Sequence, residues 1–372
     1  MTRHRASVSA ALCAVAAGPV AGGQLVLLAK PLGGVVGVPG AVVGYIVLTG
    51  AALGLFAALL CLWRMRSSVE MASACGVLAG IAVLVAGAAD TVPVFAVAVL
   101  VAGTFTGPLL VAGRTLAADL GRQSFVVMHA AAAAGLVLAA WLAGRYYENP
   151  GAGVIAAGAL TAVLGASTGL LGARLAEAPI SRRPATIGAV PRPALSGYVA
   201  VGLVVGGTVL PALHLLLFRW NEFGAEQLTW LVFAAAPAVF VVALPGRRPA
   251  AVPLLLILAA GGPVLVATAS GPVLLTVGLA VTLTAAARAM TALDEEMSLH
   301  ADRAAATAVV TAIAGFAGLG LVDLLGRVIG TGSALTVLAA CVLVAAWLCG
   351  RRDHAASPPQ GVLSSHNEGG AP

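Results

Sequence analysis

Residues 174–194 read RLAEAPISRRPATIGAVPRPA, the longest internal polar stretch in a chain of 372 residues. The stretch contains four prolines and several arginines and has no apolar periodicity, which is typical of a linker. Long, nearly charge-free segments lie on both sides of it. We therefore predict two halves, 1–174 and 195–350, a cytoplasmic linker at 175–194, and a disordered cytoplasmic tail at 351–372.

The composition excludes most soluble classes of protein. Hydrophobic residues make up 60% of the chain and charged residues only 9%, whereas about 25% of the residues in a soluble domain are charged. So little charge cannot cover a water-exposed surface, and a net charge of +6 is no nucleic-acid-binding footprint. A protein embedded in a lipid bilayer tolerates this composition, because lipid surrounds it in place of water.

The apolar segments are long enough to cross a bilayer, which requires about 20 residues per helix. Twelve such segments can be read, six in each half. They lie at 7–29, 41–63, 70–89, 92–113, 125–144, 152–173, 196–218, 228–245, 251–270, 272–290, 305–326 and 329–349. We therefore predict an all-α polytopic membrane protein with twelve transmembrane helices, arranged as two six-helix pseudo-repeats.

The distribution of basic residues supports twelve spans. The weakest boundary separates the ninth and tenth spans, where only Ser270-Gly271-Pro272 interrupts the apolar run. With twelve spans and a cytoplasmic N-terminus, 16 basic residues face inward and 4 outward, whereas fusing these two spans gives 13 and 7. Basic residues concentrate in short cytoplasmic loops. We therefore expect both termini in the cytoplasm and a multi-pass protein of the cell (inner or plasma) membrane.

The two halves look duplicated. Start-to-start offsets between corresponding spans are 189, 187, 181, 180, 180 and 177 residues, as tandem duplication would leave. Two loops also correspond: GPLLVAGRTLAADLGRQS at 107–124 and TAAARAMTALDEEMSLHADRAA at 284–305. Each contains an arginine, then an acidic residue, then a second arginine.

With this six-plus-six plan, basic linker and pair of loops, the chain resembles the major facilitator superfamily of secondary transporters. The explicit resemblance covers roughly 103–144 and 278–327, and elsewhere it is topological. The loop RMRSSVE at 64–70 lacks the Asp and Gly of the family's best-known signature, so no drug-efflux branch is assigned. The resemblance implies alternating access, in which the two halves rock around a site near the bilayer midplane.

The resemblance also places the first, fourth, seventh and tenth spans around a central substrate cavity. Candidate lining residues are Gln24, Thr104, Thr106, Tyr198, Thr208, His214, Thr282 and Thr284. Gln24 stands out, because a threonine hydroxyl often bonds to the backbone of its own helix. A cavity with so little charge suits a small neutral or amphipathic solute.

Proton coupling is one option for the energy source. We see no Asp or Glu near the predicted midplane, where proton-driven transporters commonly carry one. Histidine can exchange a proton near neutral pH, so His214 and His129 are candidate proton carriers. Alternatively, His214 bonds to backbone or lipid headgroups, and His129 caps the start of its span.

Charged residues near the inner loops predict a cytoplasmic gate, in which ion pairs between the halves hold the inner side closed. The candidates are Arg64, Arg66, Arg114, Asp119, Arg122, Arg288, Asp294, Glu295 and Arg303. Pairing within one half, such as Arg288 with Asp294, is the alternative, as is plain solvation.

The chain contains no Walker A sequence and no CxxC or HExxH spacing. We therefore predict no catalytic residues, no metal site and no cofactor.

The expected partners are the lipid bilayer and a small-molecule substrate, not nucleic acid, and we expect a functional monomer. Two other functions stay open: a polytopic membrane enzyme acting on a lipid-linked substrate, and a non-transporting scaffold or permease subunit.

Overall fold

The structure is a computed structural model of the chain. It describes residues 8–9, 12–13, 20–62, 68–172, 190–215, 225–244, 251–297 and 301–351. Within these ranges it consists of helices and short connections, without a strand.

Most helices coincide with predicted spans, but α3 lies between the first two of them, and α6, α12 and α13 extend beyond the predicted bounds. The first half comprises α2 (Ala21–Leu27), α3 (Ala29–Val36), α4 (Gly40–Cys61), α5 (Ser68–Gly87), α6 (Val92–Leu120), α7 (Arg122–Arg145) and α8 (Pro150–Gly172). The second half comprises α9 (Arg192–His214), α10 (Ala225–Ala243), α11 (Val252–Ala267), α12 (Pro272–Met297), α13 (Ala301–Ile329) and α14 (Thr331–Gly350). Nine of the 23 residues of the first predicted span, 7–29, and most of the linker at 175–194 lie outside the described residues.

Helix boundaries coincide with residues that break helices. Gly121 and Gly330, with φ of 89° and 84°, separate α6 from α7 and α13 from α14, and only glycine adopts this conformation without strain. Between Ala267 and Pro272 the chain leaves α11 and enters α12, and these two helices pack side by side. The ninth and tenth predicted spans are therefore separate helices.

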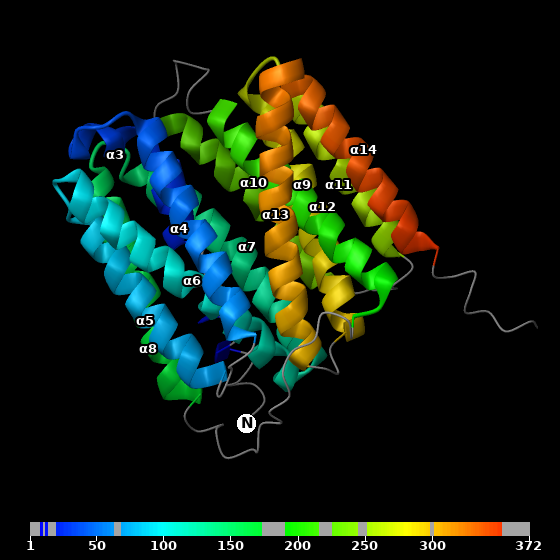
Figure 1. The fold of residues 1–372 in the computed structure, drawn as a ribbon, viewed down its shortest axis with the longest axis horizontal. Helices are drawn as coiled ribbons and strands as arrows, with labels where there is room; N and C mark the ends of the chain where they lie inside the picture. The colour runs from blue at the N-terminus through cyan, green and yellow to red at the C-terminus, as the bar shows by residue number, and fades with distance from the viewer. Residues whose placement is uncertain are drawn as a thin grey trace, which may run out of the picture.

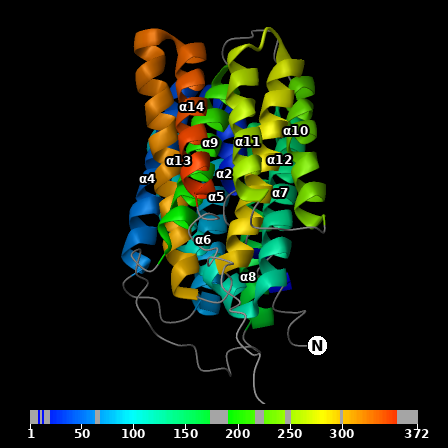
Figure 2. The same cartoon turned by 90° about the vertical axis from the view of Figure 1, so that its right-hand side faces the viewer.

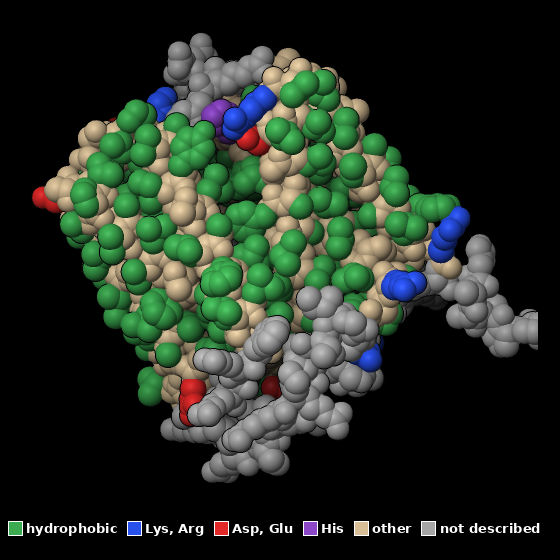
Figure 3. Space-filling model, viewed as in Figure 1, with side chains coloured by type: hydrophobic (Ala, Val, Ile, Leu, Met, Phe, Trp, Pro, Cys, Tyr) green, Lys and Arg blue, Asp and Glu red, His purple; other side chains and the backbone are tan. Residues whose placement is uncertain are grey.

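The described helices form a multi-pass membrane protein. Nine of them are long and apolar enough to cross a membrane, and two shorter apolar helices lie at Trp230–Val242 and Val252–Ala267. Large apolar side chains such as Phe56 and Phe240 are exposed on the bundle. On the face drawn in Figure 3 hydrophobic side chains cover the middle, while charged ones lie mainly toward the ends and one edge. The count of twelve spans and the cytoplasmic position of the termini stay predictions.

The helices form two groups that lie side by side (Figure 1). Packing within the first half has a counterpart in the second: α5 packs on α8 as α11 does on α14, and α4 packs on α6 as α10 does on α12. Likewise α2 packs on α7 as α9 does on α13. In each case the corresponding helices are six predicted spans apart, so the packing repeats as the offsets in the sequence predict.

The two halves contact each other on both sides of the bundle. On one side α7 lies against α10 and α12 (Figure 2). On the other side α13 lies against α6 and, to a smaller extent, α4.

Glycines spaced four residues apart bring helix backbones together within each half, because the missing side chains allow a close approach. A Cβ atom at Gly50 of α4 would lie 2.9 Å from the Val99 carbonyl oxygen of α6, and one at Gly107 of α6 would collide with the backbone of Gly54. A Cβ atom at Gly76 of α5 would lie 2.8 Å from the Cα of Gly165 on α8. Glycine is thus required at these positions for the observed helix contacts.

Candidate functional site

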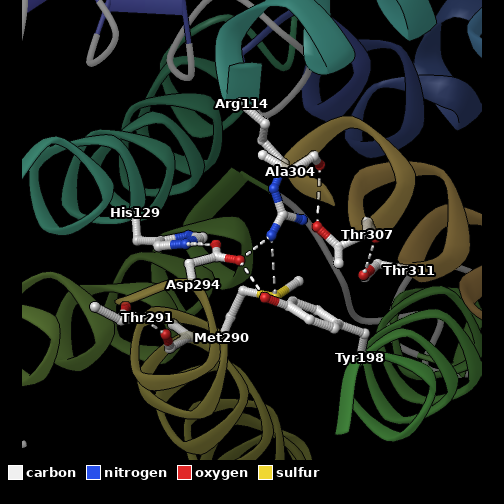
Figure 4. A network of polar contacts seen from close by, with 10 residues as sticks. Arg114, His129, Tyr198, Met290, Thr291, Asp294, Ala304, Thr307 and Thr311 are labelled. Atoms are coloured by element: carbon white, nitrogen blue, oxygen red, sulfur yellow. Dashed lines mark hydrogen bonds and ion pairs between the residues drawn. The ribbon is translucent and has the colours of Figure 1, made fainter. Parts of the chain in front are cut away.

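Charged and polar side chains of both halves meet at the end of the bundle where α6 ends and α13 begins, which we call the ionic end. The group is hereafter the ionic cluster: Arg114, Arg122, His129, Tyr198, Asp294 and Glu295. Arg114 lies on α6 and His129 on α7, both in the first half, whereas Tyr198 lies on α9 and Asp294 on α12 of the second. Figure 4 shows these four side chains pointing toward one another.

Asp294 is the centre of the cluster and is 1% exposed. One carboxylate oxygen accepts hydrogen bonds from the Arg114 guanidinium and from the Tyr198 hydroxyl, the latter at 2.8 Å. The other oxygen lies 2.6 Å from Nε2 of His129. A buried carboxylate requires such donors, since an isolated buried charge is strongly unfavourable.

Arg114 is the matching buried cation, 4% exposed. Besides the Asp294 carboxylate, its guanidinium carbon lies 5.5 Å from the centre of the Tyr198 ring, a distance at which a cation and an aromatic face attract each other. Its Nε has no hydrogen-bond partner within the described part of the chain. The charge of Arg114 is thus balanced mainly by a residue of the opposite half.

A second ion pair between the halves lies closer to solvent. The Arg122 guanidinium is 2.9 Å from the Glu295 carboxylate, with the two side chains 59% and 4% exposed. Water around Arg122 screens this pair, whereas both members of the Arg114–Asp294 pair are buried. The Arg114–Asp294 pair is therefore the stronger link between the halves.

The remaining gate candidates lie around the cluster or outside the described residues. Arg288 of α12 donates a hydrogen bond to the Val242 carbonyl oxygen at 3.2 Å. Asp119 is exposed near the end of α6, and Arg303 is half-buried near the start of α13. Arg64 and Arg66 lie outside the described residues.

An apolar layer lies next to the cluster and also joins the halves. It comprises Ala58, Leu62, Val111, Ala305, Ala308 and Val309, contributed by α13 and by the α4 and α6 region. Val111 precedes Arg114 by three residues, about one turn of α6. Ions and side-chain packing thus both close this end of the bundle.

Beyond the apolar layer is a cavity of about 190 Å³, lined mainly by α2, α4, α6 and α13. Val111, Ala308 and Val309 belong to both the layer and the cavity wall. Among the lining side chains only that of Thr106 is polar, and its hydroxyl donates to the Ala102 carbonyl oxygen at 2.8 Å. The cavity is therefore almost entirely apolar.

Thr106 is the one predicted cavity residue in this lining. Thr104 and Thr282 donate to backbone carbonyls of their own helices, at 2.8 and 3.0 Å. The hydroxyls of Thr208 and Thr284 are buried and have no hydrogen-bond partner among the described residues. For Thr104, Thr106 and Thr282 the observed bonds are the local ones that threonine commonly makes in helices.

Gln24, Tyr198 and His214 lie elsewhere than the cavity prediction placed them. Gln24 is buried and donates through Nε2 to the Ala139 carbonyl oxygen on α7. Tyr198 belongs to the ionic cluster. His214 is the exposed last residue of α9, at the opposite end of that helix from Tyr198.

The sequence did not predict that α4 and α13 form walls of the cavity. Phe316 of α13 is one of the lining residues that were not predicted. The pair Gly50 and Gly54 on α4 indicates a close contact with another helix rather than a cavity wall, because an added Cβ atom at either position would meet the backbone of α6. The contribution of α13 depends on how the two halves dock and has no local signature.

Comparisons with known proteins bear on the fold. No protein-family model and no curated protein matches this sequence. Among solved structures 250 chains match, including the crystal structure of the human organic anion transporter MFSD10 (TETRAN), with a TM-score of 0.65 and 15% identity. That match covers 93% of this chain and 99% of the other.

The class of protein is thus a multi-pass helical membrane protein built from two similar groups of helices, with a site between them. Its fold is that of the major facilitator superfamily. The resemblance noted in the sequence is confirmed at the level of the fold.

Proposed function

We propose that this protein is a secondary transporter of the major facilitator type that moves a small neutral or amphipathic solute by alternating access. The observation that carries the proposal is the contact of Asp294 with Arg114 and His129 across the two halves. A link of this kind has to break when the halves separate at the ionic end and form again when they close. The ionic cluster is accordingly the proposed gate, together with the nearby Asp119, Arg288 and Arg303 and with Arg64 and Arg66.

The energetics of a buried ion pair suit a gate. Burial removes water from both charges, and their attraction repays much of this loss. Opening the gate would return water to Arg114 and Asp294 while breaking their bond. The free energies of the open and closed states therefore stay close, as a transport cycle requires.

The apolar cavity supports a neutral or amphipathic solute, since its described lining holds no ionised side chain. The structurally similar human protein MFSD10 is an organic anion transporter. An anionic solute is not part of the proposal for this chain, because a buried anion would require a cation in the cavity wall.

Proton coupling is part of the proposal and is assigned to His129. Of the two histidine candidates, His129 is the one in contact with the Asp294 carboxylate across the halves. A proton exchanged at His129 would change the attraction between the halves directly. We further propose that the ionic end faces the cytoplasm of a cell membrane and that the monomer is the working unit, with halves 1–174 and 195–350.

Accessibility of the apolar layer tests the gate. A reporter cysteine at Ala308, which is buried, is introduced after the five native cysteines are replaced by alanine. Labelling by a membrane-impermeant maleimide is then compared between Asp294→Asn and the matched control Asp323→Asn. Asp323 pairs at 2.7 Å with Arg327 of its own helix and does not link the halves.

We expect Asp294→Asn to increase the labelling rate severalfold and Asp323→Asn to leave it unchanged. Equal rates in the two variants would exclude the proposed gate. An enzyme or a rigid scaffold would likewise show no dependence of labelling on Asp294.

A further inference from the structure

The cavity opens on the lateral face of the bundle. Its wall includes Ala51 of α4 and Leu110 of α6, both of which are exposed, Leu110 to 40%. Figure 3 shows this face hollowed between the halves, in the region where Figure 1 places α4 and α13. Phe56 of α4 and Ile313 of α13 are exposed apolar residues of the helices that border the hollow. The apolar surface of the bundle thus continues into the cavity.

The chemistry of the wall favours hydrocarbon over water. A buried water molecule needs two to four polar partners, and the Thr106 hydroxyl already donates to Ala102. Apolar cavities of comparable size, about 150 Å³, stay dry and bind benzene. A cavity of about 190 Å³ can accept part of an acyl chain or a similar hydrocarbon group.

Small residues line this space at mid-height of the bundle. Among them are Gly22 of α2, where an added Cβ atom would meet nothing within 4 Å, Ala51 of α4 and Ala312 of α13. On α6 the lining runs from Val99 to Val111, the middle of a helix that spans Val92–Leu120. In a membrane this depth corresponds to the hydrocarbon region.

The apolar layer and the ionic cluster close the cavity toward the ionic end, whereas the lateral opening leads to lipid. We infer that the cavity binds a hydrocarbon chain that enters from the bilayer between α4 and α13. This inference rests on the proposed function and deepens it. The transported solute is an amphiphile that partitions into the membrane, and its apolar part enters through this opening.

Tryptophan quenching tests the inference without a transport assay. The five native tryptophans are replaced by phenylalanine, and a reporter is introduced as Phe316→Trp in the cavity wall. The matched control is Ala317→Trp at the next position of α13, which is exposed. The proteins are compared in nanodiscs of ordinary phosphatidylcholine and of phosphatidylcholine brominated in mid-chain.

We expect brominated chains to quench both reporters and aqueous iodide to quench neither. Quenching at 317 but not at 316 would overturn the inference, because lipid would not reach the cavity. Quenching at 316 by iodide would also overturn it, because the cavity would then be open to water.

The opening itself is tested by filling it. Ala51→Phe and Ala312→Phe place a ring at lining positions of α4 and α13, and each should remove most of the quenching at 316. Ala52→Phe, exposed on α4 and outside the lining, is the control and should leave it unchanged. Equal quenching in all three variants would show that chains do not enter at this place.

A soluble amphiphile separates substrate access from ordinary lipid contact. Added decanol should compete with brominated chains and reduce quenching at 316 but not at 317. If decanol has no effect at 316, a phospholipid chain occupies the cavity permanently, and the inference about substrate access is wrong. These readouts do not depend on Asp294, so a failed gate and a failed lateral opening can be told apart.

Discussion

Asp294 shows how one residue can connect two halves of a membrane protein. Its carboxylate is a common acceptor for donors on three other helices, and the donors Arg114 and His129 belong to the opposite half. The acidic residues and arginines at the inner helix ends are visible in the sequence, and the gate hypothesis predicts ion pairs between the halves. Their pairing is not visible, because Arg114 and Asp294 are 180 residues apart.

Tyr198 and Gln24 show that the sequence does not identify the hydrogen-bond partner of a buried polar residue. Each is a polar group in an apolar segment, so the sequence marks it as unusual without indicating its partner. The partner depends on which helix lies opposite, α12 for Tyr198 and α7 for Gln24.

The two ion pairs between the halves should differ greatly in their effect on stability. Asp294→Asn leaves Arg114 buried without its counter-charge, and breaking a buried pair in this way lowers stability by about 3–5 kcal/mol. Arg122→Ala removes a partner that is 59% exposed, and Glu295 keeps a further interaction, so the loss of stability should be smaller, about 1 kcal/mol. Thermal unfolding of the two purified variants in detergent measures the difference. Equal losses would show that the Arg114–Asp294 pair is not the main link.

At the scale of helices, α4 and α6 pack through their glycines. The spacing of Gly50 with Gly54 and of Gly103 with Gly107 predicts a close contact, and the structure shows α4 and α6 as the partners. The spacing could not identify which helices meet, because similar pairs occur in several spans. Helix boundaries were more predictable, because proline and glycine act on the local backbone.

Alanine substitutions at Gly107 and Gly44 should change the stability of the protein in opposite directions. At Gly107 a methyl group would collide with the Gly54 backbone, so Gly107→Ala should lower stability by about 1–3 kcal/mol, as overpacking does. At Gly44 nothing lies within 4 Å of an added Cβ atom. Gly44→Ala should therefore be neutral or stabilising by up to about 1 kcal/mol, because alanine favours helix. Unfolding of both variants in detergent checks the signs, and a neutral Gly107→Ala would argue against the observed α4–α6 contact.

For the molecule as a whole, docking of the halves produces both the ionic cluster and the cavity. Neither exists in one half alone, since α13 supplies part of the cavity wall and α12 supplies Asp294. The positive-inside count orients this assembly in the membrane, and that orientation stays a prediction.

Transport in liposomes connects the cluster to function. We expect an imposed pH gradient to drive accumulation of at least one compound from a panel of neutral lipophilic metabolites. His129→Gln should retain downhill flux and lose gradient-driven accumulation, because glutamine hydrogen-bonds but does not exchange a proton at neutral pH. His214 lies at the end of α9 far from the ionic cluster, so His214→Gln should retain both downhill flux and gradient-driven accumulation.

The outcomes separate the remaining functions. Gradient-driven accumulation by His129→Gln would exclude this histidine as the coupling site. Absence of any flux with the unmodified protein would favour a scaffold or an enzyme.

Composition and segment length are enough to establish the membrane class and most of the helices. The reason is that each segment in a bilayer has to satisfy its backbone hydrogen bonds internally, so a local apolar run specifies a helix. The partners of the charged residues and the shape of the cavity depend instead on contacts between helices far apart in the chain. Such contacts form when the two groups of helices dock. The sequence of a single segment does not determine which surface packs against it.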